Sequence, residues 1–275
     1  MTRHFFLQHH NKSIYCVEYL PQNGKSIDTA VIICTPIWGE RIRTHRIFTS
    51  LGRELQNKNS YVLTCDYYGD GNSQGESYQL NFENIIEDLN SLYNYALEKY
   101  RIENYYFIGY RLGASAMVPL LDKLKVKKAI LIDPIFNPIS YLEEALRANL
   151  TAQMTRHKKI IKNRDALIKE IKKNQLINVD GFLIGAEMWR SFEKYSPISG
   201  NKNFKGDLMI ISSENSKNRA EEIVKFGQEF QNAKVNFVKK EVVLTSWKYY
   251  TQRPPIIFSK IFSEIFNGHQ TDAGI

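Results

Sequence analysis

The chain alternates between short apolar runs and longer amphipathic stretches, and this pattern predicts most of its elements. The apolar runs lack a regular exchange of apolar and polar positions, which is typical of strands buried in a parallel sheet. They occupy residues 30–35, 61–65, 105–108, 129–132, 208–211 and 235–238. The amphipathic stretches predict helices at residues 47–55, 82–100, 112–124 and 256–266, the last beginning after Pro254-Pro255. Strands and helices that alternate in this way predict an α/β fold with a doubly wound, mostly parallel sheet.

Two regions depart from the alternation. Residues 5–7 and 14–19 flank a turn-rich segment, which predicts an N-terminal antiparallel β-hairpin. Residues 137–203 contain no strand-helix-strand unit, and within them Ile160, Leu167, Ile168 and Ile171 fall on one helical stripe. We therefore expect a helical lid at 137–203, inserted into a core made of residues 1–136 and 204–275.

The composition favours a single globular unit. The chain has 275 residues, of which 43% are hydrophobic and 24% charged, as in soluble domains. Cys16, Cys34 and Cys65 lie in or beside apolar runs without metal-site spacing, which predicts buried, reduced thiols. The first residues lack the apolar core of a signal peptide, and no apolar run is long enough to span a membrane. We expect a cytoplasmic protein.

The positive charge is concentrated in the expected lid. Between Asn137 and Asn178 there are nine Lys and Arg residues and four acids, an excess of five in a chain of net charge +8. A solvated helix face explains this simply, and a docking surface for an acidic partner or phosphate-bearing ligand is the alternative. No nucleic-acid motif, metal cluster or dinucleotide fingerprint is present, so we predict no nucleic-acid partner, no metal and no cofactor. The pattern does not set the oligomeric state.

One pentapeptide has the frame of a catalytic nucleophile motif but lacks the nucleophile. Residues 109–113 read Gly-Tyr-Arg-Leu-Gly, the frame of a G-x-S-x-G nucleophile elbow with Arg111 at the serine position. The frame follows an apolar run and opens a predicted helix, as that motif requires. An arginine side chain stays protonated and carries only donors, so Arg111 can neither attack a carbonyl nor accept a proton.

The elbow, the strand order and the insertion resemble the α/β-hydrolase fold over nearly the whole chain. Three stretches are similar to the bacterial exosortase A system-associated hydrolases of type 2, whose elbow also reads G-x-R-x-G. The first stretch, 36–46, matches the family's corresponding segment at Pro36, Glu40 and Arg46. The second, 66–75, matches the family's glycine-rich segment except that Asn72 replaces an aspartate, and the third, 109–114, contains the elbow. This resemblance implies a link to loci for exported polysaccharide and protein sorting.

The rest of a catalytic triad is harder to find. In this fold the order is nucleophile, acid, histidine, which makes Glu214 the candidate acid and puts the histidine position near Ser246. No histidine is there. The six histidines are His4, His9, His10, His45, His157 and His269. Replacement groups are Ser115, Cys34 or Ser73 as nucleophile and His45 as base, but packing or local hydrogen bonding explains each more simply. We therefore predict an incomplete triad.

Arg111 has two interpretations. It lies over a helix N-terminus, which favours anions, and its planar fork suits carboxylate or phosphate. Alternatively, Arg111 forms an internal ion pair with Glu40 or Glu214. The expected ligand-binding residues are Trp38, Gly39, Glu40, Tyr110, Arg111, Leu112 and Trp247.

Two function hypotheses follow from these residues. We favour a protein that binds an acyl, glycosyl or other anionic intermediate, or a partner protein. The alternative is an active hydrolase or acyltransferase with a rearranged catalytic site, linked to surface polysaccharide or secondary metabolite biosynthesis. The missing histidine favours the first, because no other residue is an obvious general base.

Overall fold

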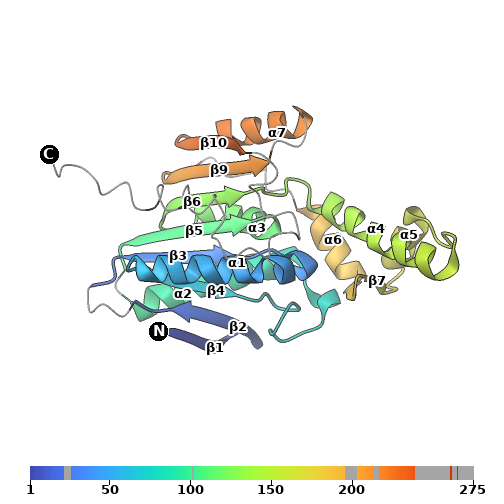
Figure 1. Ribbon diagram of the computed structural model, residues 1–275, viewed down its shortest axis with the longest axis horizontal. Coiled ribbons are helices and arrows are strands. Elements are labelled where there is room, and N and C mark those ends of the chain that lie inside the picture. The colour runs from blue at the N-terminus through green and yellow to red at the C-terminus, as the bar shows by residue number, and fades with distance from the viewer. Residues whose placement is uncertain are drawn as a thin grey trace.

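An eight-stranded sheet organises the molecule (Figure 1). The computed structural model describes residues 1–21, 26–100, 102–195, 203–213 and 217–238, with Ile261 and Ile265. The strand order is β1-β2-β4-β3-β5-β6-β9-β10; β1 and β2 form an antiparallel hairpin, β2 pairs antiparallel with β4, and the other pairs are parallel. The strands are β1 (Thr2–His9), β2 (Lys12–Tyr19), β3 (Thr29–Cys34), β4 (Tyr61–Cys65), β5 (Asn104–Tyr110), β6 (Val126–Ile132), β9 (Asp207–Ser213) and β10 (Ala233–Val238).

Helices cover both faces of this sheet. They are α1 (Trp38–Asn57), α2 (Phe82–Lys99), α3 (Leu112–Leu121) and α7 (Lys217–Gln228), with a short 3-10 helix, η1 (Ser77–Gln79). Apolar residues of α2, α3 and α7 pack in one buried cluster together with Trp38 of α1, and the later apolar residues of α1, Phe48, Leu51 and Leu55, pack in a second cluster. Every residue of β3 and β5 is buried, because both faces of these central strands are covered. The predicted doubly wound α/β fold and its N-terminal hairpin are confirmed.

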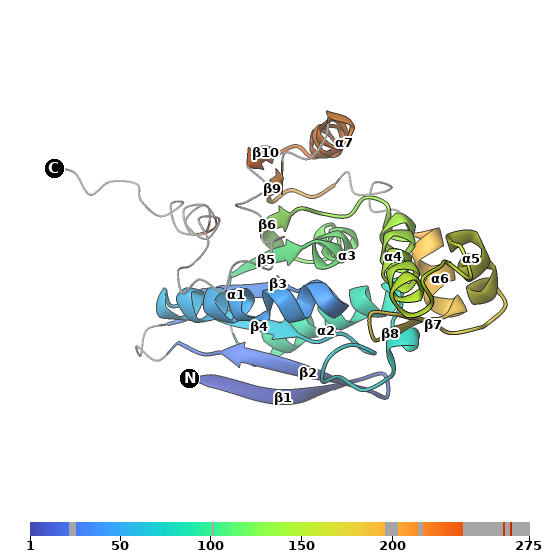
Figure 2. The ribbon, with the colours of Figure 1, turned by 45° about the vertical axis from the view of Figure 1, so that its right-hand side comes forward.

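A segment inserted between β6 and β9 lies beyond the carboxyl ends of the parallel strands (Figures 1 and 2). We call its described part, residues 137–195, the inserted segment. It contains α4 (Pro138–His157), α5 (Arg164–Lys172), β7 (Ile177–Val179), β8 (Phe182–Ile184) and α6 (Ala186–Lys194).

The expectation of a purely helical insertion is wrong, because β7 and β8 form an antiparallel hairpin. Its turn is Asp180-Gly181, and both residues have positive φ angles of 54° and 93°. This dipeptide is a strong hairpin signal that the helical interpretation overlooked. Ile160 also departs from the expected stripe. It lies exposed in the loop between α4 and α5, whereas Leu167 and Ile171 are buried on α5.

Two helices differ from their predicted extent. Helix α1 begins at Trp38 rather than at residue 47. The apolar pattern missed its first turns because they carry Gly39, Glu40, Arg41 and Arg43 in place of apolar residues. Helix α7 was not predicted. The expected helix at 256–266 falls mostly outside the described residues; within it, Ile261 and Ile265 are helical and buried in the second cluster.

A buried carboxyl group, that of Asp88 on α2, lies beside the chain that follows β4. It is fully buried and accepts a hydrogen bond of 2.8 Å from the backbone N–H of Tyr68. Its other oxygen, Oδ1, has no hydrogen-bond partner among the described residues. Burial raises the pKa of Asp88 to about 7, although the Tyr68 bond and the charge of Lys12 act in the opposite direction.

Asp88→Asn tests this assignment through pH dependence. The native state binds a proton more tightly than the unfolded chain, so the stability contribution of Asp88 falls as pH rises from about 4 to about 7. Asparagine keeps an acceptor for Tyr68 and carries no charge. We expect the variant to be more stable than the natural protein at pH 8, on the order of 4 kcal/mol, and nearly equal at about pH 4. Urea unfolding across this pH range measures both.

Glu87→Gln is the matched control, because Glu87 is the neighbouring carboxylate on α2, with a half-exposed side chain paired to Lys12. It should leave the pH profile close to that of the natural protein. Parallel profiles for the natural protein and Asp88→Asn would contradict the raised pKa.

Candidate functional site

Arg111 occupies the sharp turn between β5 and α3. Its backbone has φ 51° and ψ −119°, a strained conformation for a residue with a side chain. Its N–H donates to the carbonyl of Ile132 at 2.9 Å. A Cβ at Gly113 would lie 2.3 Å from the carbonyl oxygen of Thr35, and one at Gly109 would lie 2.4 Å from Cα of Ala114. The two glycines therefore permit the close packing that forms the elbow.

Two carboxylates neutralise the Arg111 guanidinium. Nε donates to Oε1 of Glu40 at 3.1 Å, and Nη1 donates to Oδ2 of Asp133 at 3.5 Å. The side chain of Arg111 is only 15% exposed. Burial alone would lower the pKa of Arg111, but the charges of Glu40 and Asp133 outweigh it and raise the pKa above its ordinary value. Glu40 is thus one of the two ion-pair partners predicted for Arg111, while Asp133 was not predicted as a partner.

Asp133 is firmly held. It follows β6 directly, has a φ of 49°, and is buried. Its Oδ1 accepts hydrogen bonds from Oγ of Ser212 at 3.1 Å and from Nη2 of Arg219 at 3.0 Å. Because β6 neighbours β5, the ends of the two strands bring Asp133 and Arg111 together. A charged residue directly after a buried strand was the available signal.

Glu40 is held less firmly. It lies in the first turn of α1, and its side chain is 20% exposed. Besides Arg111, it accepts a hydrogen bond of 3.3 Å from the hydroxyl of Tyr141 on α4. Glu40 therefore links the elbow to the inserted segment through one hydrogen bond to each.

A cleft of about 250 Å³ opens beside this cluster. It is lined by Trp38, Gly39, Glu40, Arg43, Arg111, Tyr141, Glu144, Ala145, Ala148, Val179, Asp180 and Phe182. The cleft thus lies between α1, the elbow and the inserted segment, and it combines charged groups with an apolar and aromatic wall.

Trp38 is the central aromatic residue of this wall. Its ring stacks on Phe182 with centroids 5.5 Å apart and planes at 18°. Its backbone has a positive φ of 53°, and its N–H donates to Oδ2 of Asp70 at 3.3 Å. The indole Nε1 is buried and has no hydrogen-bond partner among the described residues. Trp38 therefore offers both an apolar face and an unused donor.

The expected ligand-binding residues separate into three groups. Trp38, Gly39, Glu40 and Arg111 line the cleft. Tyr110 and Leu112 are buried in the second and the first hydrophobic cluster, outside the cleft lining. Glu214, Ser246 and Trp247 lie outside the described residues.

The replacement nucleophiles have structural surroundings. Ser115 is fully buried, accepts from N–H of Ile135 and donates to its carbonyl, both at 2.7 Å. Ser73 donates to the carbonyl of Asp66 at 2.6 Å and accepts from N–H of Tyr15. Burial raises the pKa of Cys34, which disfavours a thiolate.

The candidate base His45 and the cysteines lie outside the cleft lining. His45 is exposed on α1 and is not among the residues that line the cleft. All three cysteines are free and buried, as predicted.

Neither a metal cluster nor a membrane-spanning helix is found in the described part of the chain. No group of three or more His, Cys, Asp or Glu residues is arranged to hold a metal ion there. Among the described helices, none is both long and apolar enough to cross a membrane.

Solved structures with the same architecture come from several organisms. Est1E from Butyrivibrio proteoclasticus, in a structure with ferulic acid bound, is 16% identical, with a TM-score of 0.65 and coverage of 86% of this chain and 89% of that chain. The α/β hydrolase GrgF from Penicillium sp. sh18 is 12% identical, with a TM-score of 0.68 and 96% coverage of both chains. A hypothetical protein from Pseudomonas aeruginosa is 14% identical, with a TM-score of 0.66 and coverage of 98% and 94%. These likenesses show the fold.

Sequence comparison gives the family. No curated protein sequence matches the chain. The model of the family described as serine aminopeptidase, S33, matches residues 41–188, a range that includes the elbow and much of the inserted segment. Since this match spans more than half of the chain, and the fold is that of the α/β hydrolases, the chain belongs to the serine aminopeptidase S33 family of the α/β-hydrolase superfamily.

Proposed function

We propose that this protein binds an acyl, glycosyl or other anionic intermediate in the cleft beside Arg111, without the nucleophile and base of a serine hydrolase. One observation carries the proposal: a guanidinium stands where the attacking hydroxyl belongs, and it faces a cleft. Its Nε and Nη1 are paired, while Nη2 forms no hydrogen bond within the described part of the chain. Arg111 thus retains donor capacity for a ligand.

Glu40 is the group that an incoming anion would displace. Asp133 is fixed by Ser212 and Arg219, so it stays in place as the permanent counter-charge. Glu40 is partly exposed, and the only partners of its side chain in the described part of the chain are Arg111 and the hydroxyl of Tyr141, whereas Asp133 is buried and has partners deeper in the core. A ligand carboxylate or phosphate that replaces Glu40 keeps Arg111 neutralised, while the Glu40 side chain turns toward water. The exchange avoids leaving an unpaired charge in the cleft.

The cleft wall indicates the rest of the ligand. Trp38, Phe182, Ala145, Ala148 and Val179 supply an apolar and aromatic surface, and Nε1 of Trp38 is a free donor. A molecule with an acidic group and an acyl, aryl or sugar body fits this combination. The aromatic acid ferulic acid, bound in the Est1E structure, is a suitable first probe.

The similarity of three stretches to the exosortase A system-associated hydrolases of type 2 supports a bacterial setting in which such an intermediate belongs to exported polysaccharide. It also supports a cytoplasmic site for the binding step. A protein partner that delivers or receives the intermediate fits the same setting.

Family membership favours the alternative, an active hydrolase or acyltransferase with a rearranged catalytic site. The residues that line the cleft argue against it, because no serine, threonine, cysteine or histidine is found among these described residues. Glu40, Glu144 and Asp180 line the cleft and can accept a proton, but no hydroxyl or thiol nucleophile of Ser, Thr or Cys lies beside them in this lining.

Serine-directed chemistry separates the two functions. We expect a fluorophosphonate probe to leave the natural protein unlabelled under conditions that label an active serine hydrolase completely, because Ser115 and Ser73 are engaged in local hydrogen bonds. Intact-protein mass spectrometry measures the labelling. Stoichiometric modification of one serine would establish the alternative and identify its nucleophile.

Ligand titration tests the role of Arg111 and Glu40. Isothermal titration with ferulic acid, longer acyl carboxylates and phosphorylated sugars should show that Arg111→Lys weakens binding roughly 10- to 100-fold, because lysine keeps the charge and loses the planar fork. Glu40→Gln should strengthen binding about ten-fold, because it removes the competing internal anion.

Glu144→Gln is the matched control, since it removes an equal charge from the same cleft, but Glu144 pairs with Arg147 and not with Arg111. It should change affinity much less than Glu40→Gln. Equal effects of the two glutamine variants, or equal affinities of the natural protein and Arg111→Lys, would leave Arg111 as an internal ion-pair partner only.

A further inference from the structure

The loop between α4 and α5 exposes apolar side chains at the far end of the inserted segment from the sheet (Figures 1 and 2). Ile160 is 49% exposed and Ile161 56%, and Met154 in the last turn of α4 is 45% exposed. Every residue from 154 to 165 is exposed. Two adjacent isoleucines on a projecting loop present a large apolar group to solvent.

The loop is built to hold these isoleucines outside. Oε1 of Gln153 accepts hydrogen bonds from the backbone N–H groups of Ile161 and Lys162, both at 2.8 Å, and its Nε2 donates to the carbonyl of Lys162 at 3.0 Å. Lys158, with a φ of 59°, ends α4 in a left-handed conformation. These bonds define the backbone around Ile161, so its exposure follows from specific structure.

Cations surround the isoleucines. Residues 156–164 include Arg156, Lys158, Lys159, Lys162 and Arg164 and contain no acid. Lys162 pairs with Glu170, while Arg156, Lys158, Lys159 and Arg164 form no ion pair within the described part of the chain. An adjoining groove of about 290 Å³ includes Ile161 and Leu176, which is also exposed, so apolar surface continues from the loop to the base of α5.

We propose that this loop docks the protein on the surface of an anionic lipid bilayer. Unpaired lysines and arginines are attracted by anionic headgroups, and exposed isoleucines enter the boundary between headgroups and acyl chains. An acidic polypeptide or a nucleic acid would engage the cations but leave the isoleucines in water. The convex, projecting form of the loop fits a broad surface better than it fits a partner's groove.

The docking surface is independent of the proposed ligand site. No residue from 154 to 165 lines the cleft beside Arg111, although both regions share α4. Loss of docking and loss of ligand binding are therefore separate results.

Vesicle flotation tests the proposal. The full chain should bind vesicles of phosphatidylcholine mixed with phosphatidylglycerol, should not bind phosphatidylcholine alone, and should dissociate as salt is raised. Lys158→Gln with Lys159→Gln should lower the partition coefficient roughly 25-fold, because each cation near an anionic surface contributes a factor of about five. Ile160→Ser with Ile161→Ser should lower it at least about ten-fold.

Matched controls use exposed residues elsewhere. Lys123→Gln with Lys125→Gln removes the same charge from the α3–β6 connection, and Leu97→Ser removes an exposed apolar side chain of α2. Neither control should change vesicle binding, and all four variants should keep the thermal stability of the natural protein, because the altered residues are exposed. Equal losses in the control and loop variants would overturn the proposal.

Insertion can be observed directly at the loop. The natural cysteines are all buried, so Ile161→Cys provides one accessible thiol for a nitrobenzoxadiazole label. Its emission should shift to the blue and intensify with phosphatidylglycerol vesicles only. An unchanged emission with bound vesicles would refute membrane docking. Binding to soluble polyglutamate that is as strong as vesicle binding, and that persists in the variant Ile160→Ser with Ile161→Ser, would also refute it and would indicate a surface for an acidic protein.

Discussion

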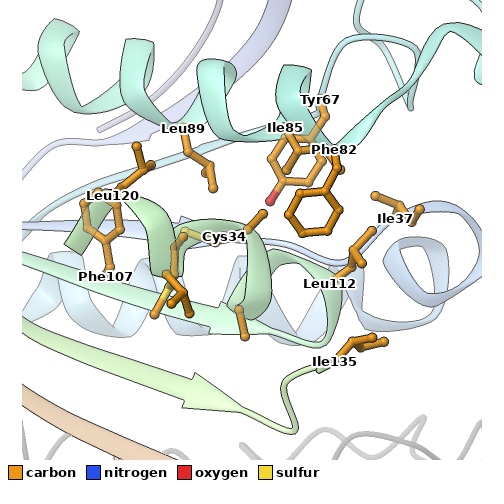
Figure 3. Packing of buried hydrophobic residues seen from close by; sticks show 14 of the residues in the cluster. Cys34, Ile37, Tyr67, Phe82, Ile85, Leu89, Phe107, Leu112, Leu120 and Ile135 are labelled. Carbon is orange, nitrogen blue, oxygen red and sulfur yellow. The ribbon is translucent and has the colours of Figure 1, made fainter. Parts of the chain in front are cut away.

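The approach of α3 to the end of β3 is the constraint on which the site depends. At Gly113 a side chain would collide with the carbonyl oxygens of Cys34 and Thr35, so glycine alone lets the helix begin there. Around this contact, Ile37, Leu112, Phe82 and Ile135 belong to the buried core (Figure 3). The packing holds residue 111 at positive φ, a conformation that costs on the order of 1–3 kcal/mol for a non-glycine residue. The elbow is therefore set by its glycines and the core, whatever side chain it presents.

A cation at that turn has to be neutralised, and the two available carboxylates differ in kind. Asp133 comes from the end of the adjacent strand, is buried, and is tied to Ser212 and Arg219. Glu40 comes from α1, is partly exposed, and is tied to the inserted segment through Tyr141. The cluster thus has one carboxylate inside the core and one at the cleft.

The sequence predicted the parts of this structure that depend on local pattern. Buried central strands appear as apolar runs because both faces of the sheet are covered, and the elbow appears because its glycines are required by backbone contacts. Asp133 could not be assigned in the same way, because its role depends on β6 lying beside β5, which no local pattern specifies. The start of α1 was missed for another reason: its first turn carries Gly39 and Glu40, which line the cleft rather than the core.

The second carboxylate completes the charge balance around the elbow. Asp133 pairs with Arg219 as well as with Arg111, so one carboxylate faces two guanidinium groups, and Glu40 supplies the second negative charge. Glu40 adds little net stability to a partly buried pair, because the cost of removing both charges from water offsets their attraction. It nevertheless lies on the cleft side of the guanidinium, and the same cleft is lined by the aromatic residues Trp38 and Phe182. In the proposed function, a ligand carboxylate or phosphate carries the same charge as Glu40 and would take its position on Arg111.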